Sequence, residues 1–473
     1  MNLIKKYTSI AFSALFMFSS VVSFPVEAAK GFSYKVINEN KKTAILTKID
    51  TNKLLELKDP IDGYSITEIK NNASKYKFRK ARAGDVDQLI ALAIILAPLV
   101  FPSVIIFAVG YATGIFDGGA RAAYFGPRIT SVNLPNCFQV GKQGLVNCRE
   151  LKTVNLPKCH YLEKGCLHGC TKMENLSVPN CTVLDDPFDI DCEFDKEYRL
   201  SHKLGYLPPQ YTKFAKLKAS KCIEVTTRSF AGFTALKKVD LRSCKTIGGQ
   251  AFYGCKALEN LELPCCTETK SASVLDKPYG AFENCESLKS INISNLIYAG
   301  ACCFKNCTAL KELDLHNCKE VQESCFKNCK SLETVLLDAC TEIQKNSFNN
   351  CVSLKKIRVP NVVTVGETAF LGNENLERID LPNCNSVGVG SFKNCKKLCN
   401  LNASNLYSIE QNAFEGDESL EEIYLPNCKI IKTQAFRDCK NLKRITVPKS
   451  CKLEKDCLPY DLLMDQKLEI VRI

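Results

Sequence analysis

The chain has 473 residues, of which 45% are hydrophobic and 24% are charged, a composition typical of folded proteins that excludes general disorder. Its formal net charge of +12 indicates either attraction to anionic partners or a solvated, lysine-rich surface, and we favour the second interpretation. The length is compatible with several domains or with one long repeat array.

Residues 1–28 are predicted to be an export signal. Lys5 and Lys6 precede an apolar run over 10–22, and the VEA sequence at 26–28 offers small residues for cleavage. The mature protein is then expected to begin near residue 29 and to be secreted or held at the cell surface. An uncleaved membrane anchor is the alternative, although the apolar run is short for a span.

Residues 29–70 are predicted to form an N-terminal cap. They contain two short segments of alternating apolar and polar residues, which favour a hairpin followed by a further strand. A repeat array needs such a cap, because its first turn otherwise exposes an apolar end and an open strand edge.

Residues 71–128 match neither the cap nor the repeats and are interpreted as an insertion. A basic run is followed by a stretch without any charge from 88 to 116. Within it, residues 89–110 (LIALAIILAPLVFPSVIIFAVG) are long and apolar enough to cross a bilayer. We therefore expect membrane association through 89–110.

A single membrane span at this place conflicts with the cap, because it puts the cap and the repeats on opposite sides of the membrane. One alternative is that Pro98 and Pro102 break the segment into a hairpin that enters the membrane and returns. A second is that the cap interpretation is wrong. A third is an apolar helical pair packed on the end of the repeats.

Residues 129–473 repeat one pattern with a fixed period. A phenylalanine opens the second half of each unit, and consecutive examples are 22 residues apart except for one step of 30. They are Phe230, Phe252, Phe282, Phe304, Phe326, Phe348, Phe370, Phe392, Phe414 and Phe436. A period of this size is typical of a solenoid, in which a turn buries its apolar side chains only by stacking on its neighbours.

One unit, residues 376–398, has the sequence LERIDLPNCNSVGVGSFKNCKKL. Ile379 and Leu381 alternate with polar residues, which predicts a short strand, and Pro382 ends it. The chain is expected to return along a second side that is compact or partly helical, with Phe392 pointing inward.

Applied to the whole region, the pattern predicts sixteen strands, including one at Leu200. The period breaks twice, at an irregular turn over 185–216 and at an insertion over 267–278. Such interruptions map to surface loops and are frequent binding sites, although simple sequence drift explains them equally well.

The combined motif LPNCxxVGxxSFxNCxxL resembles the BspA-like leucine-rich repeat family of surface proteins, and the match extends over about 131–473. The resemblance implies an α/β-type repeat solenoid, a right-handed stack of turns of about 22 residues with one short β-strand per turn. Residues 29–70 also look like the cap that precedes such repeats. The motif residues are structural, so the resemblance implies the fold far more directly than the function.

The 28 cysteines follow the repeat. Most fall in two rows, one after each strand and one after each phenylalanine. In the position before the phenylalanine, cysteine alternates with alanine and serine, which favours reduced, buried thiols used as small side chains over disulfides. The cysteines outside these rows, and therefore the better candidates for pairing or reactivity, are Cys192, Cys265, Cys302, Cys399 and Cys451.

No catalytic or metal site is expected. The cluster Cys159, His160, Cys166, His168 and Cys170 has a spacing that follows from the repeat, so zinc binding is disfavoured. No nucleophile elbow, phosphate loop or paired-histidine motif is present in the sequence. We expect no cofactor and no enzyme; if the protein is one, its pocket is expected within 185–216.

The outward position of each predicted strand is polar and variable, as expected of a solvent-facing surface that binds macromolecules. Arg358, Asp380 and Tyr424 are its candidate ligand-binding residues, because arginine and tyrosine are frequent in binding hot spots. The leading hypothesis is an exported, adhesin-like protein that binds a protein or glycan ligand on another surface, with no nucleic-acid partner. The alternative is a membrane-active protein whose segment 89–116 inserts into a target bilayer.

Overall fold

The computed structural model describes residues 129–473 except 142–143, 147, 189–210 and 275, together with the backbone of Arg128 and of five strands nearer the N-terminus. Those five are β1 (Pro25–Ala28), β2 (Phe32–Asn38), β3 (Thr43–Ile49), β4 (Leu54–Lys58) and β5 (Ser65–Ile69). Most of the predicted signal and the whole of 89–110 lie outside these residues. Among the residues described, no helix is both long and apolar enough to cross a membrane.

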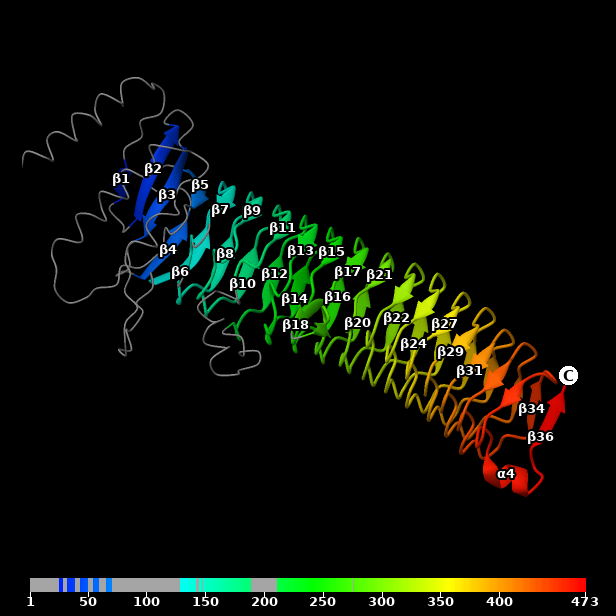
Figure 1. Cartoon of the computed structure of the whole chain (residues 1–473). Coiled ribbons are helices and arrows are strands. Elements are labelled where there is room, and N and C mark those ends of the chain that lie inside the picture. The colour runs from blue at the N-terminus through cyan, green and yellow to red at the C-terminus, as the bar shows by residue number, and fades with distance from the viewer. Residues whose placement is uncertain are drawn as a thin grey trace, which may run out of the picture.

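The repeats form an elongated stack of parallel strands that runs from β6 to β36 (Figure 1). Each turn contributes one strand to a first strand row. This row consists of β6 (Arg128–Asn133), β8 (Thr153–Asn155), β10 (Asn175–Ser177), β12 (Lys216–Lys218), β14 (Lys238–Asp240), β16 (Asn260–Glu262), β20 (Ser290–Asn292), β22 (Glu312–Asp314), β24 (Thr334–Leu336), β26 (Lys356–Arg358), β28 (Arg378–Asp380), β30 (Asn400–Asn402), β32 (Glu422–Tyr424), β34 (Arg444–Val447) and β36 (Glu469–Arg472).

A second strand row lines the other side of the stack. It consists of β7 (Gln139–Val140), β9 (Tyr161–Leu162), β11 (Val183–Leu184), β13 (Glu224–Val225), β15 (Thr246–Ile247), β17 (Glu268–Thr269), β21 (Tyr298–Ala299), β23 (Glu320–Val321), β25 (Glu342–Ile343), β27 (Thr364–Val365), β29 (Ser386–Val387), β31 (Ser408–Ile409), β33 (Ile430–Ile431) and β35 (Lys452–Leu453). These fourteen strands within the described residues make the second side of each turn compact, built of strand and tight turns and not of helix. The only helix described is α4 (Tyr460–Met464), after the last full turn.

Both rows continue toward the N-terminus. Strand β4 pairs in parallel with β6, and β5 pairs in parallel with β7. Strand β3 pairs in parallel with β5 and antiparallel with β2, which in turn pairs with β1. The backbone of these strands therefore covers the N-terminal edge of each row.

The core is a continuous column between the two rows. In β26 the central Ile357 is 8% exposed while its neighbours Lys356 and Arg358 face solvent, and in β27 Val365 is 2% exposed. This is the alternation that a strand with one buried face requires. Each turn repeats it, so neighbouring turns share one apolar core.

A ladder of phenylalanines fills the corner of the core predicted from the 22-residue period. From Phe230 to Phe436, each ring stacks on the ring of the next turn with centroids 5.0–5.6 Å apart and planes within 15° of parallel. The rings are fully buried, so the ladder contributes both burial and aromatic contact.

The strand predicted at Leu200 has no place in the first row. Strand β10 pairs directly with β12, with Leu176 opposite Leu217, so the chain between these strands closes one turn instead of two. Residue 200 itself lies outside the described residues. On either side of residues 189–210, Phe188 and Tyr211 pack with ring centroids 4.8 Å apart. Phe188 also meets Phe230, the first ring of the ladder, edge-on with centroids 6.1 Å apart.

The second break is a hairpin. Strands β18 (Ala272–Val274) and β19 (Lys277–Tyr279) pair antiparallel between β17 and the corner before Phe282. The stack itself is uninterrupted, because β17 pairs with β21 on the far side of the insertion.

The cysteines described are all free thiols, and most are buried. In the row after each strand, the thiol donates to the backbone carbonyl two residues later, as Cys384 does to Ser386 at 3.2 Å. In the row after each phenylalanine, it donates to the phenylalanine carbonyl of the preceding turn, as Cys351 does to Phe326 at 3.1 Å. Cysteine in these rows is thus both a small apolar side chain and a hydrogen-bond donor.

Candidate binding surface

The first strand row presents its outward side chains to solvent. Arg358 on β26 and Asp380 on β28 lie at equivalent positions of adjacent strands, and Tyr424 on β32 lies two turns further along. The structure therefore places all three on the same face. Tyr424 is 58% exposed, and Leu336, opposite Arg358 in the ladder, adds an exposed apolar group.

The two charged residues do not bond each other. Arg358 donates through Nε to the carboxylate of Asp338, whereas Asp380 accepts from both Nε and Nη2 of Arg378 at 3.0 and 3.1 Å. Each charge is thus compensated locally. Tyr424 is the exposed aromatic group of the three, and its neighbour across the ladder is Thr446.

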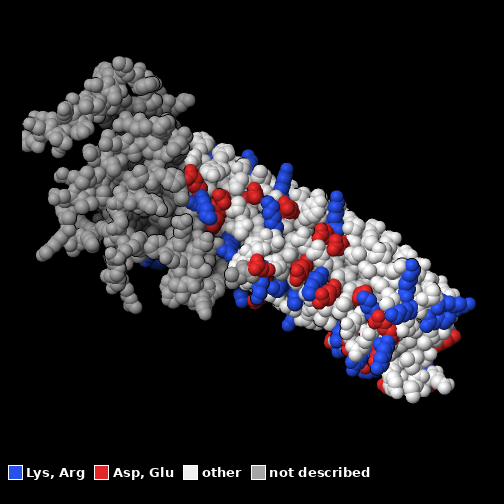
Figure 2. All heavy atoms as spheres, viewed as in Figure 1, with Lys and Arg blue, Asp and Glu red and all other residues white. Residues whose placement is uncertain are grey.

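Charges of both signs alternate over the surface visible in Figure 2. Many form ion pairs between equivalent positions of adjacent turns, such as Lys355 with Glu333 at 3.1 Å and Lys443 with Glu421 at 2.8 Å. Both members of these pairs are about half exposed, so each pair contributes at most about 1 kcal/mol. Each such pair is neutral as a unit, so these lysines add no local excess of positive charge.

The two breaks in the repeat meet at one depression of about 370 Å³. Asp185 and Asp186, which precede residues 189–210 in the chain, form one wall, and Ala272 and Ser273 of the hairpin form another. Its polar groups bond one another: Lys164 lies 3.7 Å from Asp186.

The polar side chains on the floor of this depression also form hydrogen bonds within the protein. Thr226 donates to Asp185 at 3.2 Å, and Arg228 donates through Nε to Gln250 at 2.6 Å. These contacts describe a structural junction and not a set of groups aimed at a substrate.

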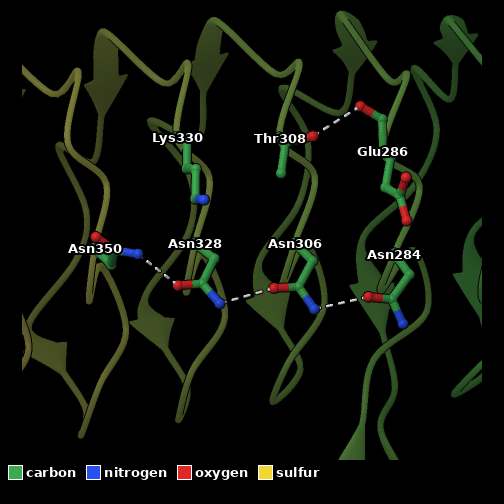
Figure 3. Close-up of a pocket in the computed structure, with 7 residues that line it drawn as sticks. All are labelled: Asn284, Glu286, Asn306, Thr308, Asn328, Lys330 and Asn350. Carbon is green, nitrogen blue, oxygen red and sulfur yellow. Dashed lines mark hydrogen bonds between the residues drawn. The ribbon is translucent and has the colours of Figure 1, made fainter.

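A second depression, a groove of about 330 Å³, follows the corner after the phenylalanine ladder (Figure 3). Its floor is a ladder of side-chain amides from four consecutive turns, formed by Asn284, Asn306, Asn328 and Asn350. The sequence carries the signal in the Asn-Cys pair that recurs every 22 residues. Because that pair is part of the structural motif of the repeat, the sequence alone does not single out the asparagines.

The cysteine and histidine cluster near residue 160 is dispersed. Cys159 and Cys170 donate to the carbonyls of Tyr161 and Leu145, and His160 stacks on Phe138 with centroids 6.1 Å apart. Burial raises the pKa of the Cys166 thiol well above its usual value. Within the described residues, no group of three or more potential ligands is placed to hold a metal ion.

The repeat geometry agrees with a comparison against protein families. The model of the BspA type leucine rich repeat region matches residues 120–188, 210–333, 272–376 and 341–460, in six copies. The chain belongs to the BspA-type leucine-rich repeat family. Proteins with such repeats are generally binding scaffolds and not enzymes, and the family supports a repeat protein that takes part in protein interactions. A search of curated protein sequences finds no match.

Several solved structures of leucine-rich repeat proteins are similar to this BspA-type chain. A leucine-rich repeat protein from Bacteroides ovatus is 16% identical, with 91% of this chain and 99% of that chain covered and a TM-score of 0.45. The pneumococcal vaccine antigen PcpA is 14% identical, with 96% and 100% covered and a TM-score of 0.37. A leucine rich cell surface protein from Faecalibacterium prausnitzii is 15% identical, with 96% and 95% covered and a TM-score of 0.30.

Proposed function

We propose that this BspA-type protein is exported and displayed at a cell surface, where its solenoid binds a protein or glycan ligand on another surface, as an adhesin does. The observation that supports this most directly is the first strand row. Its outward side chains are free of core packing over the whole length of the stack, which gives a long surface whose chemistry varies from turn to turn.

Arg358, Asp380 and Tyr424 are the proposed ligand contacts on this face. Tyr424 offers exposed aromatic area, and the arginine and aspartate offer hydrogen bonds that a ligand gains by exchange with Asp338 and Arg378. Charged rim contacts are individually weak, so we expect the tyrosine to contribute most of the affinity.

The test applies beads coated with the full protein to arrays of immobilised glycans and of cell-surface ectodomains. The triple variant Arg358→Ala, Asp380→Ala, Tyr424→Ala is compared with Glu342→Ala, Lys345→Ala, Tyr407→Ala, which removes the same kinds of side chain from elsewhere on the solenoid. Loss of binding in the first variant alone supports the proposal. Equal binding by both variants and the parent excludes this face.

Surface display is tested separately, by membrane fractionation and protease protection of two tags, one placed after residue 29 and one at the C-terminus. The attachment we propose is the uncharged segment 89–110, which rests on the sequence alone. The membrane-bound parent protein is expected to expose both tags outside the cell, and deletion of 89–110 is expected to release it from the membrane. Accessibility of only one tag contradicts attachment by a re-entrant hairpin.

The same segment supports a second candidate function, insertion of 89–116 into a target bilayer, because the stretch from 88 to 116 carries no charge. Release of a dye from liposomes by the parent protein, and not by the deletion variant, favours this function. Cell binding that is unaffected by the deletion favours the adhesin.

A further inference from the structure

We propose that the asparagine groove binds an extended, carboxylate-bearing glycan chain, with the amides of Asn306, Asn328 and Asn350 contacting successive sugars and Lys330 contacting a carboxylate. The inference rests on the proposed function only in the assumption that the solenoid is a binding protein. It uses a groove at a different corner from the first strand row.

The floor of the groove is an ordered ladder (Figure 3). Nδ2 of Asn306 donates to Oδ1 of Asn284 at 2.7 Å, Asn328 donates to Asn306 at 2.9 Å, and Asn350 donates to Asn328 at 2.9 Å. All amides therefore point the same way along the stack. Each side-chain amide has two N–H donors and two acceptor lone pairs, so every inner member keeps one donor and one acceptor beyond the ladder itself.

The backbone alone does not require these amides. All four asparagines have φ between 62° and 64°, the left-handed region that asparagine and glycine both tolerate. Gly254 and Gly372 occupy the equivalent position in the turns on either side, with φ of 67° and 76°. Asparagine in four consecutive turns thus adds polar groups that glycine omits.

The rim of the groove holds one uncompensated cation. The rim position, two residues after the left-handed residue, is filled in successive turns by Lys256, Glu286, Thr308, Lys330, Val352, Glu374, Lys396, Glu418 and Lys440. Lys256 pairs with Glu286 at 2.8 Å, and the last four residues form two further pairs at 2.9 and 3.1 Å. Lys330 forms no ion pair with any residue that the structure describes, and it stands directly over the ladder (Figure 3).

The spacing of the amides selects the ligand. Adjacent turns are about 4.8 Å apart, a distance close to the rise per sugar of an extended 1,4-linked pyranose chain. An extended peptide advances only about 3.3 Å per residue and so falls out of step with the ladder. Successive sugars of an extended β-1,4-linked chain alternate in orientation, so each turn meets one sugar and neighbouring amides meet different hydroxyls.

The chemistry of the groove points the same way. Sugar hydroxyls both donate and accept, which matches amides that keep one donor and one acceptor each. Single-stranded nucleic acid needs a basic groove with aromatic platforms, whereas this groove is lined by one lysine and no aromatic ring.

The experiment uses the full protein and two tetrasaccharide probes, cellotetraose and its oxidised counterpart, β-1,4-linked tetraglucuronate, in isothermal titration calorimetry. The double variant Asn306→Gly, Asn328→Gly keeps the left-handed backbone and removes two amides. Its control is Asn394→Gly, which makes the same exchange at the same repeat position (φ 62°) outside the groove. Lys330→Met tests the charge.

We expect tetraglucuronate to bind the parent protein and the control variant equally, and the double variant at least tenfold more weakly. Lys330→Met is expected to remove the preference for tetraglucuronate over cellotetraose. Failure of both sugars to bind, or equal binding by the double variant, overturns the proposal. Equal binding of a tetraglutamate peptide shows attraction by charge alone and also overturns it. None of these outcomes bears on Tyr424, so the adhesin face is tested independently.

Discussion

Asp417 accepts a hydrogen bond from the backbone N–H of Cys395 through Oδ1, at 2.8 Å, while its Oδ2 is fully buried without a partner. The aspartate occupies the row after the phenylalanine, where most turns carry cysteine. Asn373 makes the same contact two turns earlier, with the N–H of Cys351 at 2.9 Å. Burial raises the pKa of the Asp417 carboxyl well above its usual value, so burial disfavours its charged form.

Asp417→Asn is therefore expected to stabilise the C-terminal turns at neutral pH. The pKa of Asp417 is raised in the folded state. Its contribution to the free energy of unfolding is therefore complete below the unfolded pKa of about 3.9 and declines as pH rises toward the folded pKa. Between these two pKa values, the free energy of unfolding of the variant rises relative to that of the wild type by about 1.4 kcal/mol per pH unit. Urea unfolding from pH 4 to pH 8 measures this difference. If the free energies of unfolding of the two proteins change in parallel with pH, the burial of an acid is contradicted.

Phe348→Ala is expected to destabilise the centre of the solenoid by about 3–5 kcal/mol. The ring is fully buried and stacks on Phe326 at 5.0 Å and on Phe370 at 5.2 Å, so its loss opens a cavity between two turns. Hydrogen exchange should then report opening around residue 348 before the ends of the stack unfold. Tyr424→Ala, at an exposed site, is the control and is expected to stay within about 0.5 kcal/mol of the parent. Equal losses for both variants would show that the ladder carries no special stability.

Much of the fold could be predicted because the same sequence pattern recurs in successive turns. The spacing of the phenylalanines predicted the stack, and the alternation around residues such as Ile379 predicted the strands of the first row. The second row was missed, since two-residue strands such as β27 leave only one buried residue and therefore no period. The prediction of a strand at Leu200 was wrong, because a count of residues cannot show whether the chain between β10 and β12 forms two turns or one.

The candidate sites were less predictable. The outward direction of Arg358 and Tyr424 followed from strand alternation, but their partners did not. Asp338 lies twenty residues before Arg358 and reaches it only because adjacent turns stack. The asparagine ladder follows from the 22-residue spacing of the Asn-Cys pair. The open groove above it depends on which charged rim residues form ion pairs, which the sequence does not show.

Gly280→Ala is expected to disrupt the corner after the hairpin. A Cβ at this position would lie 1.9 Å from the carbonyl oxygen of Cys302 and 2.4 Å from the backbone nitrogen of Cys303, so the next turn must move. We expect a loss of roughly 1–3 kcal/mol. Gly254→Asn is the control: its φ of 67° suits asparagine, and the nearest atom to an added Cβ, Gly232 Cα, is 3.8 Å away. Thermal unfolding compares the two, and a tolerated Gly280→Ala refutes the close approach.

The thiol ladders are expected to resist alkylation in the folded protein. Burial raises the pKa of Cys351 to about 12, which leaves almost no thiolate at pH 8. Among the described cysteines only Cys265 and Cys399 are exposed. Brief treatment with iodoacetamide at pH 8, followed by peptide mapping, should modify these two and spare the ladders, whereas the same treatment in urea should modify all. The matched control is Cys265→Ser with Cys399→Ser, which should lose both labelled peptides and keep the parent's unfolding midpoint. Rapid labelling of Cys351 without denaturant would contradict a closed core, because the reagent reaches that thiol only when two turns separate.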